Sequence, residues 1–185
     1  MATDNEKKFS VELLKKLVRY EPDTGKLFWL HRTPEVSKHN PGRESFNARF
    51  AGKEIRKKNL GYVVVSVSLD LEISEFRGHR VAWALHTGEW PGVEIDHENM
   101  VRDDNRWSNL REATHGQNNQ NKLAPGNNKS GFKGVHWHKG SGKWRAQIRA
   151  GDVRKDLGLH ESAELAGKAY AEASKALHGK FSNIQ

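Results

Sequence analysis

Residues 93–97 of the chain read VEIDH, and a polar loop separates them from LREA at residues 110–113 and from the Asn-rich run GQNNQN at residues 116–121. The first two segments have the length and apolar character of short strands, whereas the third suits a helix that begins near His115. This order predicts a β-β-α unit whose first strand ends in the adjacent Asp96 and His97. We assign the chain to the α+β class.

The residue types in this unit suit hydrolysis of a phosphodiester, which needs a base for the attacking water and a cation that neutralises the charge on the phosphate. His97 can act as the base because imidazole titrates near neutrality. Asp96 and the amide oxygen of Asn118 can bind a hard divalent cation together with water and phosphate. Asn109 can hold the imidazole through its second ring nitrogen. Asn119 is the alternative to Asn118, since a shift of one residue exchanges them.

Each of these residues also has a purely structural interpretation. An Asp-His pair arises by chance in a chain with ten His, and it can form a turn or a cap. Asn105 and Asn109 are of a type common in loops and turns. The combined spacing, rather than any single residue, favours the catalytic interpretation.

Composition excludes several other classes of protein. The 185 residues contain no Cys, so disulfides, Cys-ligated zinc, iron–sulfur clusters and a thiol nucleophile are excluded. The apolar runs are too short to cross a bilayer, and no apolar signal core follows Met1. We therefore expect an intracellular protein. A net charge of +8 and a pI near 9.7 favour a polyanionic partner, above all nucleic acid.

The positive charge is concentrated in the last third of the chain. Residues 123–185 hold 11 Lys+Arg and 5 Asp+Glu, a much larger excess than in the residues before them. The stretch 123–130 is rich in turn-forming residues and poor in side chains that fill a core. We therefore expect a first domain at 1–122, a linker at 123–130 and a second domain at 131–185.

Three segments of the second domain, 131–137, 143–149 and 154–159, have strand-like patterns and are separated by Gly-containing turns. They predict a three-stranded antiparallel sheet, packed on one helix at 163–178 with Leu165 and Leu177 in its apolar stripe. Alternation places Trp137 and Ile148 toward the helix and basic side chains on the open face, and we expect Trp137 and Trp144 in the core. A basic face of this kind fits the major groove of DNA.

In the first domain, the patterns predict a helix from Ser10 to Tyr20 and a long loop at 34–58. They also predict a β-hairpin that joins 61–69 to 73–77, followed by a helix at 79–86.

The first domain resembles the HNH endonucleases, particularly the phage and intron-encoded homing type, over roughly residues 61–122. The resemblance rests on His79-Arg80-Val81-Ala82-Trp83, Ile95-Asp96-His97, Asp104-Asn105-Arg106, Asn109-Leu110-Arg111, Ala113-Thr114 and the cluster Asn118 to Asn121. It implies that His97 is the general base, that Asp96 and Asn118 bind one divalent metal ion, and that Asn109 positions His97. We expect Mg²⁺, with Mn²⁺ as the alternative. The segment 98–101 departs from the family, which often has a Gly-containing turn there.

Residues 129–185 resemble the AP2 DNA-binding domain through SGFKGV at 130–135, GKWRAQI at 142–148 and HGKFSN at 178–183. The resemblance implies that DNA is contacted by Lys133, His136, His138, Gln147, Arg149 and Arg154. Asp156 stands where the plant proteins usually have Trp, so their base preference does not carry over. The alternative is that these charges form only a solvated sheet face.

Together, the two resemblances imply a metal-dependent endonuclease of the homing type that nicks or cuts double-stranded DNA by phosphodiester hydrolysis. The second domain would bind the target. The alternative is a non-catalytic, DNA-binding transcription regulator of the AP2 type. We expect it in the cytoplasm of a bacterial or phage-infected cell, as a monomer or a homodimer.

Overall fold

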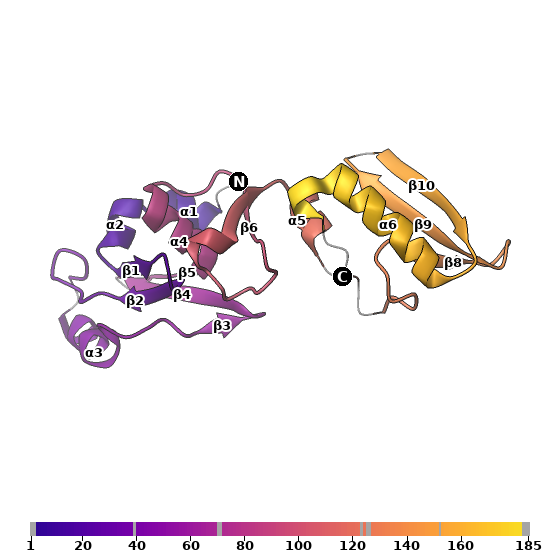
Figure 1. The fold of residues 1–185 in the computed structure, drawn as a ribbon. Helices are drawn as coiled ribbons and strands as arrows, with labels where there is room; N and C mark the ends of the chain where they lie inside the picture. The colour runs from indigo at the N-terminus through magenta and orange to yellow at the C-terminus, as the bar shows by residue number, and fades with distance from the viewer. Residues whose placement is uncertain are drawn as a thin grey trace. The chain divides into compact units, whose positions relative to one another are not determined.

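The computed structural model describes residues 3–38, 40–69, 72–122, 124, 127–151 and 153–182 (Figure 1). Its contacts divide the chain into two compact units, Met1–Ala113 and Thr114–Gln185. This division falls earlier than the predicted linker at 123–130, part of which lies outside the described residues. None of the described helices is long and apolar enough to span a membrane.

The first unit contains three small antiparallel sheets and four short helices among its described residues. Its sheets pair β1 with β2, β4 with both β3 and β5, and β6 with β7. The elements are α1 (Asp4–Lys8), α2 (Val11–Lys15), β1 (Val18–Glu21), β2 (Lys26–Trp29), α3 (Asn40–Phe50), β3 (Lys58–Asn59), β4 (Tyr62–Leu69), β5 (Glu72–Arg77), α4 (Gly78–Thr87), β6 (Glu94–His97), a 3₁₀ turn (Trp107–Asn109) and β7 (Leu110–Ala113).

The hairpin β4–β5, the helix α4 and the pair β6–β7 confirm the sequence-based predictions. The predicted helix from Ser10 to Tyr20 is wrong beyond Lys15, because residues 18–21 pair as a strand with residues 26–29. The predicted loop at 34–58 is also wrong in part, since it contains the eleven-residue helix α3. Phe46 of this helix packs edge-on against Trp29, which anchors an otherwise polar segment.

A buried ion pair fixes α4, which leads toward β6, to the first helix of the chain. Arg80 is 8% exposed and Glu6 is 3% exposed. The guanidinium donates to both carboxylate oxygens, with Nε 2.6 Å from Oε1 and Nη2 2.9 Å from Oε2. It also donates to the carbonyls of Pro91 and Val93, just before β6. One side chain therefore ties α1, α4 and the start of β6 together.

The second unit is a three-stranded antiparallel sheet in the order β10–β9–β8 with one long helix packed against it (Figure 1). This arrangement confirms the predicted sheet and helix. Val135, Ala146 and Ala166 form the buried centre between them. The elements are α5 (His115–Asn121), β8 (Val135–His138), β9 (Lys143–Ala150), β10 (Val153–His160), α6 (Ala163–His178) and a 3₁₀ turn (Gly179–Phe181).

Two details of the second unit differ from prediction. Trp137 was expected in the core, but it is 48% exposed at the end of the sheet and meets Trp144 edge-on. Leu165 and Leu177 are also exposed, because α6 turns small and polar residues toward the sheet instead. Its buried residues are Ala166, Gly167, Tyr170, Ser174 and His178.

Loss of the buried carboxylate should destabilise the first unit strongly. The change Glu6→Gln leaves the Arg80 guanidinium buried without its counter-charge, and we expect a loss of about 3–5 kcal/mol in the free energy of unfolding. Urea denaturation measures this loss. Glu12→Gln, which breaks the exposed pair with Lys15, is the control and should leave the midpoint unchanged. Equal midpoints for Glu6→Gln and the parent would contradict the role of the ion pair.

Candidate active site

Asp96 and His97 close the strand β6, which pairs antiparallel with β7. The register sets Asp96 opposite Arg111 and His97 opposite Leu110. Successive side chains of a strand point to opposite faces, so Asp96 and His97 serve different surroundings. Both are buried, at 6% and 5% exposure. The site therefore contains two adjacent polar side chains that are shielded from bulk water.

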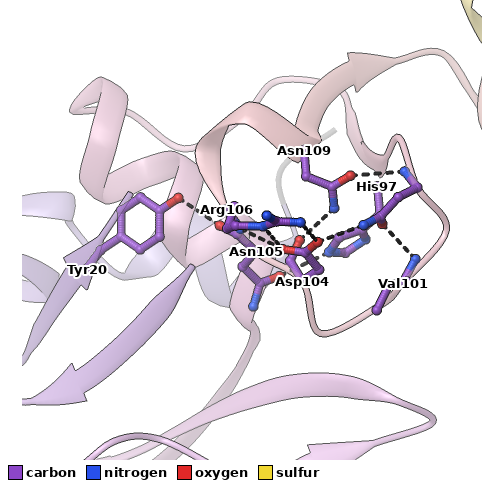
Figure 2. A network of polar contacts seen from close by, with 8 residues as sticks. Tyr20, His97, Val101, Asp104, Asn105, Arg106 and Asn109 are labelled. Carbon is purple, nitrogen blue, oxygen red and sulfur yellow. Dashed lines mark hydrogen bonds and ion pairs between the residues drawn. The ribbon is translucent and has the colours of Figure 1, made fainter. Parts of the chain in front are cut away.

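The imidazole of His97 is held by a residue for which sequence reasoning assigned no catalytic role. Nε2 of His97 lies 3.0 Å from Oδ1 of Asn105, which is 1% exposed (Figure 2). With the amide oxygen as acceptor, Nε2 carries the proton and the lone pair of the neutral ring is on Nδ1. Burial lowers the pKa of His97 below its usual value, opposed by the bond from Asn105 and the charge of Asp96. The ring is thus a neutral base at pH 7.

Asn105 is itself fixed from the far side of the unit. Its carbonyl accepts a hydrogen bond of 2.7 Å from the hydroxyl of Tyr20 in β1 (Figure 2). The backbone of Gly25, between β1 and β2, comes so close that a Cβ there would lie 2.4 Å from the nitrogen of Arg106. Gly25 also has φ +72°, a conformation that favours glycine. The β1–β2 hairpin therefore packs against the loop between β6 and β7 and fixes the position of Asn105.

Two aromatic rings complete the surroundings of His97. The ring centroid of His79, from α4, lies 5.0 Å from that of His97 in an edge-on arrangement. Tyr62, at the start of β4, lies 6.0 Å from His97 and 5.4 Å from His79. Burial, with the charges of His97 and Arg80 next, lowers the pKa of His79 to about 3. The three rings therefore form a cluster in which His79 stays uncharged.

Asn109 stabilises the loop between β6 and β7. Its Oδ1 accepts from the backbone nitrogen of Asn99 at 3.0 Å, and its Nδ2 donates to the carbonyl of Asp104 at 2.7 Å (Figure 2). Sequence reasoning gave Asn109 the task of holding the imidazole. The described hydrogen bond of Nε2 is donated to Oδ1 of Asn105, whereas the two described bonds of the Asn109 side chain are made within the loop.

Asp104 is the second anchor of this loop. Its carboxylate accepts from Nε and Nη2 of Arg106 at 2.8 and 2.6 Å and from Nδ2 of Asn99 at 2.7 Å. The bond from Arg106 is the main reason that the pKa of Asp104 falls to about 2, and the bond from Asn99 adds to it. The loop that carries Asn105 is therefore closed by charge-assisted hydrogen bonds.

Asp96 is engaged by an arginine from the neighbouring strand. Arg111 donates from Nε and Nη2 to Oδ2 of Asp96 at 3.0 and 2.9 Å. The pairing register puts Asp96 and Arg111 opposite each other. Antiparallel pairing of the two predicted strands could therefore have indicated this contact from the sequence. These bonds fix the orientation of the Asp96 carboxylate.

The other predicted metal ligand, Asn118, lies in α5 of the second unit. Thr114 caps this helix, and the nitrogen of Asn118 donates to the Thr114 carbonyl at 2.9 Å. Asn118 is half-buried. Its neighbour Asn119 is exposed, and Oδ1 of Asn119 accepts from the ammonium of Lys122 at 2.6 Å. The amide oxygen of Asn119 is thus bound to a cation at the C-cap of its helix.

The donor types at these positions fit a hard divalent cation. A carboxylate and an amide oxygen are oxygen ligands that Mg²⁺ accepts, with water and phosphate in the remaining positions. Among the described residues, no group of three or more His, Asp or Glu side chains is placed to hold a metal ion.

The open face of the second unit's sheet collects most of the predicted DNA-contacting residues. Cross-strand pairs place His136 with Arg145, His138 with Lys143, Gln147 with Asp156 and Arg149 with Arg154 on one face. Arg145 is bound to Asp156 on that face. Lys133 is the exception, because its half-buried ammonium donates to the carbonyls of Gln120 and Lys122 at 2.6 and 2.5 Å.

Comparison with known proteins relates the residues of this site to the HNH endonucleases. Residues 77–120, which include His79, Asp96, His97 and Asn118, match the family model of the HNH endonucleases. Protein 3.8 of Escherichia phage T7 is 29% identical over 110 residues, which are 59% of this chain and 90% of that protein. A solved structure described as DNA binding and cleavage by the HNH homing endonuclease I-HmuI aligns with 93% of this chain and 90% of its own, at 18% identity and a TM-score of 0.42.

The carboxylate of Asp104 should make the stability of the first unit depend on acid pH. Because its pKa is lowered to about 2 in the folded chain from a usual 3.8, the stabilisation is complete above pH 3.8 and is lost as the pH falls toward 2. Asp104→Asn should lower stability at neutral pH by about 1–3 kcal/mol and flatten this acid dependence. Urea unfolding between pH 5 and pH 2.5, roughly the window of that titration, measures both effects. An acid dependence identical to that of the parent would count against this account.

Proposed function

We propose that this chain, an endonuclease with its HNH domain at residues 77–120, hydrolyses phosphodiester bonds of double-stranded DNA and acts as a homing-type enzyme. The observation that carries the proposal is the state of His97: a buried, neutral imidazole whose Nε2 is held by Asn105. An imidazole in this state is suited to accept a proton near neutral pH. The excess of positive charge agrees with a nucleic-acid substrate.

In the proposed reaction, Nδ1 of His97 takes the proton of the water that attacks phosphorus. Asn105 fixes the tautomer and the ring plane, and the rings of His79 and Tyr62 limit the movement of the imidazole. Asp96, oriented by Arg111, and Asn118 would bind one divalent metal ion, Mg²⁺ or Mn²⁺. When bound, such an ion neutralises charge on the phosphate and on the departing oxygen. Asn119, whose Oδ1 accepts from Lys122, is the alternative amide.

The second unit is proposed to be an AP2-like module that binds target DNA. His136, His138, Gln147, Arg149 and Arg154 share the open face of the sheet. A strand ribbon with this composition can enter the major groove and contact bases and phosphates. Lys133 has another role in this proposal, since its ammonium is bound to the end of α5 and its pKa is lowered by burial.

The second candidate function is a DNA-binding regulator that does not cut. The open basic face would serve it equally well, but a regulator has no need of a buried His97 with an oriented ring. A single active site in each chain nicks one strand if the protein acts as a monomer, and two cooperating copies cut both strands. The test of His97 below separates cutting from binding alone.

Removal of the imidazole should abolish cleavage and leave binding intact. We expect His97→Ala to reduce plasmid nicking in Mg²⁺ by about 10²–10⁴-fold, because a positioned general base contributes about that much. Agarose gels measure nicking, and gel shifts measure binding. His31→Ala, at an exposed histidine outside the site, is the control and should nick normally.

Two further arms test the cation within the same assay. EDTA should stop nicking by the parent, and added Mg²⁺ or Mn²⁺ should restore it. Asn118→Ala should raise the Mg²⁺ concentration needed for cleavage, whereas Asn119→Ala should not. Nicking by His97→Ala at the parental rate would refute the assignment of the base. DNA binding without nicking by the parent would favour the regulator.

The proposed DNA face should show itself in the salt dependence of binding. Arg154 and Lys155 are adjacent, exposed and equally charged, but Arg154 pairs with Arg149 on the open face and Lys155 with Ile148 on the helix side. Arg154→Gln should reduce the slope of log Kd against log salt by about 0.9, the value for one phosphate contact. Lys155→Gln should leave it unchanged. Equal slopes for both variants would rule out the open face as the binding surface.

A further inference from the structure

The turn between β3 and β4 contains a leucine in an unusual place. Asn59 pairs with Tyr62, so Leu60 and Gly61 alone form the turn, and both have positive φ, 52° and 83°. Two-residue turns with both residues left-handed favour Asn-Gly or Asp-Gly. A leucine there costs about 1–2 kcal/mol relative to the usual backbone conformation. Leu60 is also 73% exposed, so its apolar side chain gains little from burial.

Two arginines hold this turn in a fixed position. Arg77 donates from Nη1 to the carbonyl of Asn59 at 3.1 Å, and Arg102 donates from Nη1 to the carbonyl of Leu60 at 2.9 Å. Both guanidinium carbons lie 5.1 Å from the centroid of the Tyr62 ring. The backbone that carries the exposed Leu60 is therefore held by hydrogen bonds from two arginines.

The same turn reaches the candidate active site. Tyr62 follows the turn directly, and its ring lies 6.0 Å from the ring of His97. Within the described part of the chain, neither Arg77 nor Arg102 has a carboxylate within ion-pair distance, so both can meet phosphates. Lys58, just before the turn, is paired with Asp103 at the surface, and such exposed pairs are weak. An apolar tip surrounded by cations thus lies next to the catalytic ring cluster.

We propose that Leu60 is a wedge that enters the base stack of the DNA beside the scissile phosphodiester. This inference rests on the proposed nuclease function and adds the way in which the duplex is prepared for cutting. Proteins that kink DNA insert single apolar side chains between base pairs while neighbouring cations hold the backbone, and unstacking costs a few kcal/mol per step. A strained, exposed leucine between two arginines has the chemistry of such a wedge. Opening the step would displace the adjacent phosphate toward His97.

The test uses Leu60→Asn, which suits a left-handed turn and removes the apolar tip. The nick made by the parent is first mapped on a plasmid, and short duplexes of that sequence then carry 2-aminopurine at successive positions across it. Binding by His97→Ala protein should raise 2-aminopurine fluorescence at one step, and the double variant with Leu60→Asn should lose that rise. Ile73→Asn is the matched control, since Ile73 is 72% exposed in β5 of the same sheet and pairs with Ser68 near the opposite end of β4.

Cleavage gives an independent readout. Leu60→Asn should cut intact duplex at least about tenfold more slowly, since the cost of unstacking is no longer offset. A mismatch at the affected step should restore the rate, which a merely misfolded variant would not do. Leu60→Gly should behave like Leu60→Asn.

The two proposals fail in different ways. If the parent nicks DNA but no position brightens and Leu60→Asn cuts at the parental rate, the wedge is refuted and the nuclease function stands. If the parent does not nick, the proposed function fails, and duplexes with 2-aminopurine throughout a bound sequence still decide whether Leu60 unstacks bases. A change in oligomeric state caused by Leu60→Asn, without a change in fluorescence, would assign Leu60 to a protein interface and overturn the wedge.

Discussion

The catalytic arrangement depends on the burial of one amide, that of Asn105. This side chain fixes the ring of His97, and its own backbone is held by the hydroxyl of Tyr20 and by close contact with Gly25. The next residue but one, Trp107, donates its backbone N–H to the carbonyl of Pro22 at 2.9 Å. A polar loop of this length would otherwise sample many conformations. The β1–β2 hairpin removes that freedom, so the folded chain itself holds the ring of His97 in place.

Charge plays a different part in each region of the first unit. The Glu6–Arg80 pair is buried and structural, whereas the bonds of Asp104 close a loop near the surface. Asp96 is also buried, and Arg111 from the neighbouring strand holds its carboxylate. The three carboxylates thus act on different parts of the unit.

The sequence predicted those elements whose pattern is local. The β4–β5 hairpin, α4 and the β6–β7 pair have clear periodicities. Asp96 and His97 lie at the end of one of these predicted strands. The helix predicted to Tyr20 was wrong at its end, where residues 18–21 pair as a strand with residues 26–29. The apolar pattern of four residues fits the last turn of a helix as well as a short strand. Helix α3 was not predicted because its apolar side chains do not form a clear stripe along one face of the helix. The hydrogen bond between Asn105 and His97 was not predicted. It depends on the path of a loop, and hydrophobic periodicity carries no information about that path.

The link between Glu6 and Arg80 joins residues 74 positions apart, and it is completed only by the carbonyls of Pro91 and Val93. Synthesis on the ribosome proceeds from the amino end, so the first helix emerges long before its partner exists. Until then, an acidic side chain destined for the interior stays in water. The nascent polypeptide consequently cannot complete this buried network until the segment that follows α4 has left the exit tunnel.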